Sequence, residues 1–259
     1  PLAGEVRALR VVAMRERFLV AAATAAGALR LTTVPTRAGS MPSVPVALGT
    51  GADFSSSAFE ASATPAGALL AWAQGPSVAV QPVDDSLDAP PSTVAVRARP
   101  GAMIERFALV RRGTDVALVW SESADPGVVA WSFVSARGEP AAPRLLEVRP
   151  AGAPADAEPA SRWVAAALGS TGTVVVGLSP RRSPLAIVAT FAHPEGPIRR
   201  VVAATALYPV IASLASAADR PLLAWSERTG PGGRVVLSRI GFDGSAVGEP
   251  IEIDRDSAD

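Results

Sequence analysis

Paired carboxylates are the side chains of this chain that could most directly perform a reaction. Two acids across a cleft can hydrolyse a glycosidic bond, one as the acid and the other as nucleophile or base. Acidic residues lie before or near the start of several apolar segments: Asp53, Glu60, Glu105, Asp156 and Glu158. No local motif singles out a pair among them. We take Asp53, Glu105 and Glu158 as the carboxylates that a glycan-acting hydrolase would use, and keep this enzyme as the alternative interpretation.

A second candidate set consists of polar side chains that follow a tryptophan by two residues. Trp72 is followed by Gln74, Trp120 by Glu122 and Trp225 by Glu227. Each polar group stands where an apolar segment reaches a turn, so it could bind a ligand or a cation at one edge of the fold. The ordinary alternative is that such a group caps turn amides or pairs with an arginine such as Arg228. Gln74, Glu122 and Glu227 are the candidate ligand-binding residues.

Residue types argue against most other chemistries. The chain has no cysteine, so thiol catalysis, disulfides and thiolate metal sites are impossible. His193 is the single histidine, and no serine or acid near it forms a recognisable catalytic arrangement. The acidic run at residues 84–88 lacks the glycine and the distal glutamate of a calcium loop. We therefore assign no catalytic residue and expect no metal and no cofactor.

Charge and hydropathy argue against nucleic-acid and membrane partners. The 259 residues include 24 acidic and 24 basic side chains, every basic one an arginine, and the formal net charge is zero. A neutral chain has no overall field that would attract a polyanion. Two uncharged runs, residues 163–180 and 201–218, are interrupted by Gly, Ser or Pro and are not apolar enough to cross a bilayer. We predict no nucleic-acid partner and no membrane span.

The chain repeats itself about every fifty residues, and this repeat is the main evidence for its fold. The segments "VALVWSESADPGVVAWSFVSARGEP" and "PLLAWSERTGPGGRVVLSRIGFDGSAVGEP" both contain Trp-Ser-Glu, a polar turn, an apolar run and a turn that ends in Glu-Pro. A third copy is anchored on Trp72, and two further copies have Ala21 and Gly177 at the anchor position. The five anchors 21, 72, 120, 177 and 225 are separated by 51, 48, 57 and 48 residues.

Each copy contains four short apolar segments bounded by Gly, Pro and Ser, which is the pattern of β-strands. The first and second predicted strands are residues 6–14 and 18–24, 57–63 and 68–74, 105–111 and 116–122, 162–168 and 174–179, and 208–215 and 222–227. The third and fourth are residues 28–34 and 44–49, 77–83 and 93–98, 128–134 and 144–148, 185–191 and 198–203, and 234–240 and 250–254. The Ala-rich stretch 201–219 could form a helix, but Pro209 interrupts it and the repeat favours strands.

Four strands per copy of about fifty residues are typical of a β-propeller blade. One such sheet cannot bury both of its faces alone, whereas radial stacking of several sheets covers face with face. The chain resembles bacterial β-propeller repeat proteins, whose blades carry an "hhAWSE…G…G-x-P" pattern. The resemblance covers the whole chain at the level of the repeat, and it implies an architecture shared by proteins of many functions rather than one activity.

We predict an all-β fold, a single β-propeller domain over residues 1–259. Five four-stranded blades would occupy about 5–49, 54–99, 104–149, 161–204 and 207–254. A fragment of a six- or seven-bladed propeller is the alternative, and a β-sandwich pair or a β-helix is the remaining possibility.

The function that the sequence favours is a non-enzymatic binding or scaffold propeller that recognises a protein or a glycan on one face of the ring. We expect a monomeric domain of a longer exported or cell-surface protein, in an extracellular, periplasmic or surface location. Trp72, Trp120 and Trp225 could each stack on a ligand, but their place inside apolar strands favours wedging between neighbouring blades.

Overall fold

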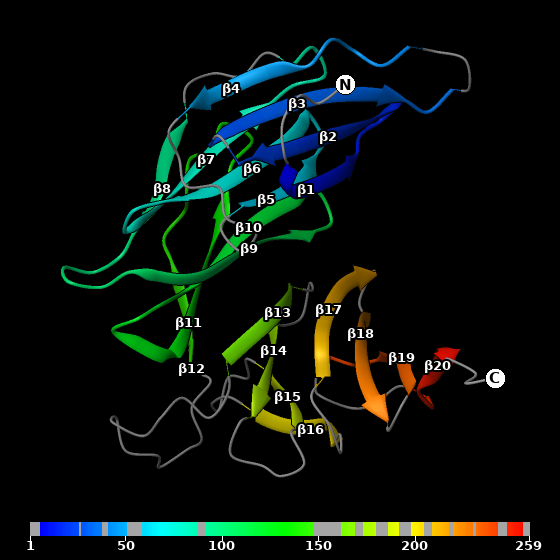
Figure 1. Ribbon diagram of the computed structural model, residues 1–259. Coiled ribbons are helices and arrows are strands. Elements are labelled where there is room, and N and C mark those ends of the chain that lie inside the picture. The colour runs from blue at the N-terminus through cyan, green and yellow to red at the C-terminus, as the bar shows by residue number, and fades with distance from the viewer. Residues whose placement is uncertain are drawn as a thin grey trace. The chain divides into compact units, whose positions relative to one another are not determined.

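The computed structural model describes residues 6–25, 27–37, 41–50, 59–87, 92–147, 162–168, 173–179, 186–191, 198–204, 209–217, 220–229, 232–242 and 248–255. Every regular element among them is a β-strand, and the strands form five four-stranded antiparallel sheets (Figure 1). Neighbouring strands in each sheet are also neighbours along the chain, so every sheet is built from one continuous segment. The all-β class and the four-stranded sheets are as the repeat predicted.

Sheet 1 contains β1 (Val6–Ala13), β2 (Arg17–Thr24), β3 (Ala28–Pro35) and β4 (Val46–Thr50). Sheet 2 contains β5 (Phe59–Thr64), β6 (Gly67–Gln74), β7 (Ser77–Val83) and β8 (Thr93–Arg97). Sheet 3 contains β9 (Ile104–Arg112), β10 (Asp115–Glu122), β11 (Asp125–Val134) and β12 (Arg144–Glu147). Sheet 4 contains β13 (Arg162–Leu168), β14 (Thr173–Ser179), β15 (Ala186–Phe191) and β16 (Ile198–Ala204). Sheet 5 contains β17 (Pro209–Ala217), β18 (Arg220–Thr229), β19 (Gly232–Arg239) and β20 (Ile251–Arg255).

These bounds lie within a few residues of the predicted strands in all five copies. The Ala-rich stretch that could have been helical forms β16 and β17 instead. Its residues pair along the chain with β15 and β18, so the ladder partners supplied by the repeat outweigh the helix propensity of alanine.

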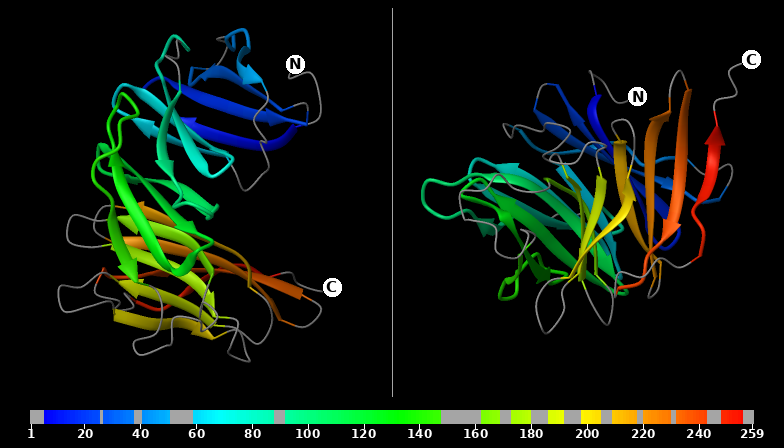
Figure 2. Two further views of the ribbon diagram at one scale, coloured as in Figure 1. Left: turned by 90° about the vertical axis from the view of Figure 1, so that its left-hand side faces the viewer. Right: turned by 90° about the horizontal axis from the view of Figure 1, so that it is seen from below.

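The chain divides into two compact units, one of residues 1–125 and 130–144 and the other of residues 126–129 and 145–259. In the first unit the first strands of the three sheets, β1, β5 and β9, lie side by side in that order. In the second unit β13 lies beside β17 in the same way. Figure 2 shows the strands of each sheet following one another in chain order. The single ring over the whole chain, with its five blades, stays a prediction.

Apolar side chains pack between successive sheets of the first unit. Between sheets 1 and 2 the core includes Leu19, Leu29, Leu31, Phe59, Leu70 and Trp72. Between sheets 2 and 3 it includes Leu69, Val78, Val80, Phe107, Leu118 and Trp120. We call the face toward the following sheet the leading face and the opposite one the trailing face. Sheet 2 therefore buries both faces, because alternate residues of β6 belong to different cores.

The register of the first repeat copy differs from the prediction by one residue. Trp72 and Trp120 both lie on trailing faces, whereas Ala21 packs on the leading face of sheet 1 with Leu19 and Leu31. Successive side chains of a strand point to opposite faces. The residue of β2 that is equivalent to Trp72 and Trp120 must therefore be a neighbour of Ala21. Ala22 lies two residues before the end of β2, as Trp72 does before the end of β6. The predicted anchor Ala21 is wrong, and Ala22 replaces it.

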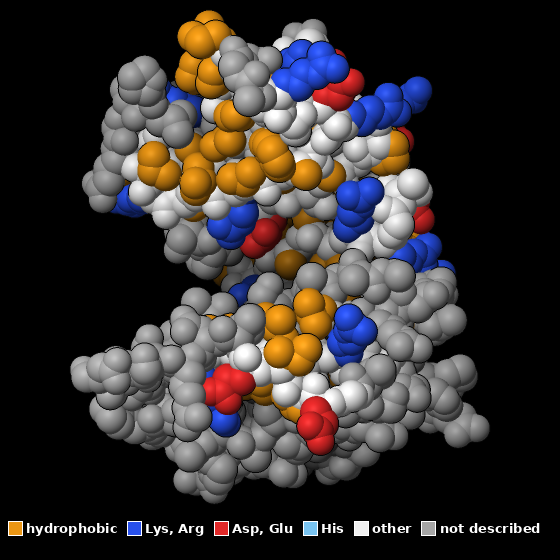
Figure 3. Space-filling model, turned by 90° about the vertical axis from the view of Figure 1, so that its right-hand side faces the viewer, with side chains coloured by type: hydrophobic (Ala, Val, Ile, Leu, Met, Phe, Trp, Pro, Cys, Tyr) orange, Lys and Arg blue, Asp and Glu red, His pale blue; other side chains and the backbone are white. Residues whose placement is uncertain are grey.

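The trailing face of sheet 1 is apolar and exposed. Leu9, Val11 and Phe18 have exposed fractions of 49%, 57% and 40%. In the ladder, Val11 lies opposite Val20 and Phe18 lies opposite Val34. Figure 3 shows hydrophobic side chains gathered on one face of this part of the molecule. Sheets 2 and 3 bury the corresponding face against the preceding sheet of the same unit.

Turn chemistry positions the strand ends. Gly67 opens β6 with a φ of 145°, and a Cβ there would overlap the carbonyl oxygen of Val83. At the end of β7, Asp84 Oδ1 accepts hydrogen bonds from the Ser86 amide at 2.9 Å and the Ser86 hydroxyl at 2.8 Å. The described part of the acidic run at 84–88 is thus a turn closed by its own aspartate.

Candidate functional site

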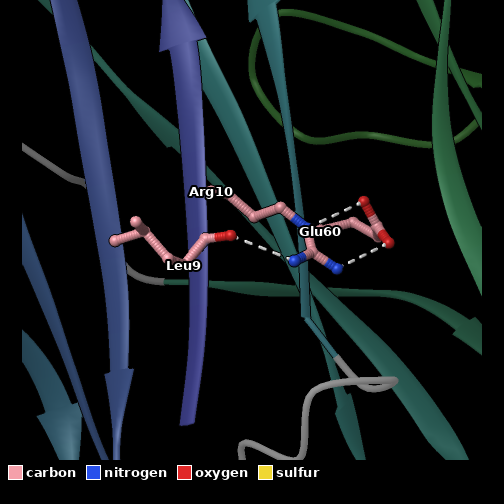
Figure 4. Close-up of polar contacts among 3 residues, drawn as sticks. All are labelled: Leu9, Arg10 and Glu60. Carbon is pink, nitrogen blue, oxygen red and sulfur yellow. Dashed lines mark hydrogen bonds and ion pairs between the residues drawn. The ribbon is translucent and has the colours of Figure 1, made fainter. Parts of the chain in front are cut away.

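The first-strand edge of the first unit carries an ion pair between two sheets. Arg10 of β1 donates from Nη2 to Glu60 Oε1 at 3.2 Å and from Nε to Oε2 at 3.4 Å (Figure 4). The same guanidinium donates from Nη1 to the carbonyl oxygen of Leu9 at 3.1 Å. Both side chains are about one-third exposed. The two-point contact joins sheets 1 and 2 through their first strands.

Arg106 of β9 adds a second cation near Glu60. Partial removal from water lowers the pKa of Arg106 from its ordinary value, while the nearby charge of Glu60 acts in the opposite direction. Glu60 therefore lies in the field of guanidinium groups from the sheets on either side. Because both of its oxygens accept hydrogen bonds from Arg10, Glu60 suits a structural ion pair between the sheets.

Of the predicted hydrolytic carboxylates, Glu105 alone lies among the described residues. Glu105 lies exposed on β9. Asp53, Asp156 and Glu158 lie outside the residues that the structure describes. Glu60, which the sequence placed in the wider group of acids, makes the Arg10 ion pair instead. The selection of Asp53, Glu105 and Glu158 stays a prediction.

Glu122 holds together one edge of sheets 2 and 3. Its Oε2 accepts a 2.8 Å hydrogen bond from Arg99 Nε and a 3.3 Å bond from the Arg99 amide. The pair raises the pKa of Arg99, chiefly through the hydrogen bond and then through the charge of Glu122. The side chain of Glu122 is 15% exposed and that of Arg99 59%. Glu122 thus combines both ordinary roles of a turn carboxylate, pairing with an arginine and accepting from a turn amide.

Backbone hydrogen bonds bring the neighbouring turns to the same edge. The Ala98 amide donates to the Pro76 carbonyl at 2.8 Å, and the Ser123 amide donates to the Met103 carbonyl at 2.9 Å. The Met103 amide in turn donates to Ser123 Oγ at 2.9 Å. The connection 98–103 therefore links the β6–β7 turn to the β10–β11 turn. We call residues 74–76, 98–103 and 122–124 the loop edge.

The three predicted ligand-binding residues have different surroundings. Gln74 ends β6 and is exposed at the loop edge, which also contains Glu122. Glu227 belongs to the other unit, where its backbone lies in β18 opposite Pro209 and Arg234. The structure thus brings Gln74 and Glu122 to one edge. The role of all three in ligand binding stays a prediction.

The anchor tryptophans are packing residues. Trp72, Trp120 and Trp225 have exposed fractions of 9%, 5% and 4%. In register, Trp72 lies opposite Phe59 on β5 and Trp120 lies opposite Phe107 on β9. The indole Nε1 atoms of Trp120 and Trp225 are buried without a hydrogen-bond partner in the structure. Buried rings of this kind cannot offer a face to a ligand, which agrees with wedging between sheets.

Within the described residues, no group of three or more His, Cys, Asp or Glu side chains is placed to hold a metal ion. No helix long and apolar enough to cross a membrane is present among them.

Sequence reasoning missed the cationic partners at both edges. Arg10, Arg99 and Arg106 were not singled out, because an isolated arginine carries no local motif. One signal was available: Arg10 and Glu60 are 50 residues apart, which is close to the length of one repeat. Side chains at matching positions of successive copies face each other when the copies stack as sheets.

Comparisons with known proteins bear on the fold. No protein-family model matches the chain, and no curated protein matches it in sequence. Among solved structures, AofleA from Arthrobotrys oligospora aligns with a TM-score of 0.53 and 10% identity, over 95% of this chain and 74% of that protein. A variant of AofleA with three arginine-to-alanine substitutions aligns with a TM-score of 0.54 and 10% identity, over 98% of this chain and 77% of the variant.

TolB from Acinetobacter baumannii aligns with a TM-score of 0.51 and 9% identity, over 98% of this chain and 55% of TolB. These similar structures are β-propellers, so the four-stranded sheets described above are of the propeller type. At a sequence identity near 10%, the structural similarity indicates the fold but says nothing about activity.

Proposed function

We propose that the chain is a non-enzymatic binding or scaffold β-propeller of five blades, which recognises a protein or a glycan through the loop edge. The observation that supports this proposal is the set of hydrogen bonds that Glu122 accepts. Its carboxylate accepts hydrogen bonds from both the guanidinium and the backbone amide of Arg99, which fixes this polar group at the loop edge where Gln74 is exposed. A preorganised edge of this kind suits recognition, because little conformational entropy is lost on binding.

Two further features support a binding role over a catalytic one. The described acids near the first strands are Glu60, which pairs with Arg10, and Glu105, which is exposed on β9. The anchor tryptophans Trp72, Trp120 and Trp225 are buried packing residues. An exported or surface location, within a longer protein, is part of the same proposal.

The test is a binding screen of the purified chain on an array of immobilised neutral glycans, with a parallel screen against surface-protein extracts. Binding found there is then measured for Gln74→Ala and Glu122→Gln. Glu16→Ala serves as the matched control, since Glu16 is an exposed residue of the β1–β2 turn. We expect the two loop-edge substitutions to weaken binding by about tenfold, the loss of one or two good hydrogen bonds, and the control to leave it unchanged.

Equal binding by all three variants would remove the loop edge as the binding surface. Release of reducing sugar from any glycan, abolished by Glu105→Gln, would replace the proposal with the hydrolase. The blade number is tested separately by an experimental structure of the whole chain, in which a sixth sheet or an open ring would contradict five closed blades.

A further inference from the structure

The connection between β3 and β4 of sheet 1 carries an exposed apolar segment that the proposed function does not use. Residues 41–46 read Met-Pro-Ser-Val-Pro-Val, and no charged residue occurs between positions 38 and 52. Met41 and Val44 are 85% and 83% exposed, and the two prolines are exposed as well. We call residues 41–46 the proline segment. It leads into β4, which stands at the end of sheet 1 opposite β1 (Figure 1).

Covalent geometry restricts the backbone of the proline segment. A proline ring holds φ near −65°, and the residue before a proline is confined to extended or polyproline II conformations. Four of the five residues 41–45 either are prolines or precede one, and all five lie outside the regular strands. The segment therefore loses little conformational entropy when a partner binds it in this extended form.

Ser43 ties the proline segment to β3. Its amide donates to the Thr33 carbonyl at 2.9 Å, and its Oγ accepts a 2.8 Å hydrogen bond from the Thr33 amide. Its carbonyl accepts a further 2.8 Å bond from Thr32 Oγ1. The middle of the segment is thus held at the edge of the sheet by backbone and side chain together.

The period of a polyproline II helix accounts for the exposure along the segment. Such a helix has three residues per turn, so Ser43 and Val46 share one of its three edges. That edge lies against β3, because Ser43 bonds to it and Val46 is opposite Leu31 in the ladder. Met41 and Val44 share a second edge, and the two prolines share the third. Both of these edges point to solvent.

The same backbone arrangement recurs in sheet 3, where Ala141 takes the place of Ser43. The Ala141 amide donates to the Phe133 carbonyl at 2.8 Å, and its carbonyl accepts from Ser132 Oγ at 2.6 Å. One proline precedes Ala141 directly and another follows it by two residues, as around Ser43. The two prolines are therefore a repeated structural device at the entry to the fourth strand.

The side chains that the two copies display are different. At the positions of Met41 and Val44, sheet 3 has Glu139 and Ala142. The repeated backbone device thus explains the prolines, but it does not require large apolar side chains in water. Met41 and Val44 are the most exposed of the large hydrophobic side chains among the described residues. An apolar pair displayed in this way indicates a surface that a partner covers.

We propose that the proline segment docks into an aromatic-lined groove of a partner domain, of the kind that binds polyproline II segments. Proline rings and the thioether of Met41 both pack well on aromatic rings. The carbonyl groups of a polyproline II backbone can accept hydrogen bonds from tryptophan or tyrosine donors in such a groove. The proposal goes beyond the proposed function, because the loop edge belongs to sheets 2 and 3 and the proline segment to sheet 1.

The experiment measures binding of the whole purified chain to a panel of isolated SH3 and WW domains by biolayer interferometry. We expect at least one domain to bind, with an affinity that changes less than about twofold between about 50 and 500 mM salt, because the segment is uncharged. Pro42→Ala and Pro45→Ala should each weaken binding about tenfold, as the loss of two buried CH2 groups predicts. Val44→Ser should weaken it similarly while both prolines and their backbone stay in place.

Pro140→Ala and Pro143→Ala are the matched controls, because they remove the equivalent rings from sheet 3 and should leave binding unchanged. Circular-dichroism melting verifies that every variant is folded. Equal losses in the controls, or unchanged binding by Val44→Ser, would overturn the site. Binding that salt abolishes would overturn the apolar contact, and no binding to any domain of the panel would overturn the aromatic-groove partner. Dimerisation of the chain alone that Val44→Ser abolishes, followed by analytical ultracentrifugation, would replace that partner with a second copy.

Discussion

Replacement of Trp120 tests the reading of the anchor residues as wedges between sheets. Trp120 is 5% exposed and packs between sheets 2 and 3 with Leu69, Val80 and Phe107 among its neighbours. Removing a buried ring of this size loses its transfer free energy and leaves a cavity. Trp120→Ala should therefore lower the free energy of unfolding by about 3–5 kcal/mol, as other large core truncations do.

Trp120→Phe separates the packing of the ring from its polar nitrogen. Trp120 Nε1 is buried without a hydrogen-bond partner, and an unsatisfied buried donor costs roughly 1–3 kcal/mol. Phenylalanine removes that donor and keeps most of the apolar contact, although it loses packing worth roughly one or two kcal/mol. The two effects nearly cancel, so we expect Trp120→Phe to change stability by less than about 1 kcal/mol.

The assay is equilibrium urea unfolding followed by far-ultraviolet circular dichroism at matched protein concentration. Because the chain has two compact units, transitions that do not coincide are fitted separately. Trp225→Phe is the internal comparison, since its Nε1 is also buried without a partner. A loss below about 1 kcal/mol for Trp120→Ala would refute burial of the ring and return it to the ligand-stacking interpretation. A loss for Trp120→Phe as large as that for alanine would refute the argument from the unpaired nitrogen.

Three further predictions concern other parts of the structure and are tested by the same unfolding assay. Gly67→Ala should cost roughly 2 kcal/mol or more, since its Cβ would overlap the Val83 carbonyl. At Gly75, which has a φ of 58° and open space around it, alanine should cost only about 1 kcal/mol, and equal losses would count against the overlap. A double-mutant cycle on Arg10 and Glu60 should give a coupling of about 0.2–1 kcal/mol that falls with added salt, because both groups are partly exposed, and a salt-independent value would contradict this. Ser132→Ala should lose about 1 kcal/mol with the 2.6 Å bond to Ala141, whereas an unchanged midpoint would mean that the bond contributes nothing.

The strands could be predicted from the sequence because their signals are local and repeated. Each run of Val, Leu and Ile between turn residues predicts a strand by itself, and a similar run about fifty residues away supports the same prediction. The one error in register, Ala21 for Ala22, arose where the repeat has alanine on both sides of the anchor. With Ala21, Ala22 and Ala23 all buried, composition alone gives no alternation to show which side chain faces which sheet.

The polar contacts were less predictable because their partners are distant in sequence and arginine has a long reach. Glu122 was singled out from its position after Trp120, but its partner Arg99 lies 23 residues earlier, in a connection without a motif. Trp131 and Arg144 are close in sequence, yet nothing in the sequence shows that the guanidinium lies over the ring. Such contacts depend on the relative placement of two strand ends, which the apolar pattern does not encode.

The repeat nevertheless constrains polar pairing between sheets more than it first suggests. Arg10 and Glu60 occupy the first strands of successive sheets and are separated by about one repeat length, and Arg106 lies on the first strand of the next sheet. Stacked copies bring matching positions together, so alternating charge at such positions links sheets whereas like charge would separate them. A polar residue inside an apolar repeat can therefore be compared with the residue one copy away before a ligand is invoked for it. By that comparison Glu60 is structural, because its partner Arg10 lies at the matching position one copy earlier.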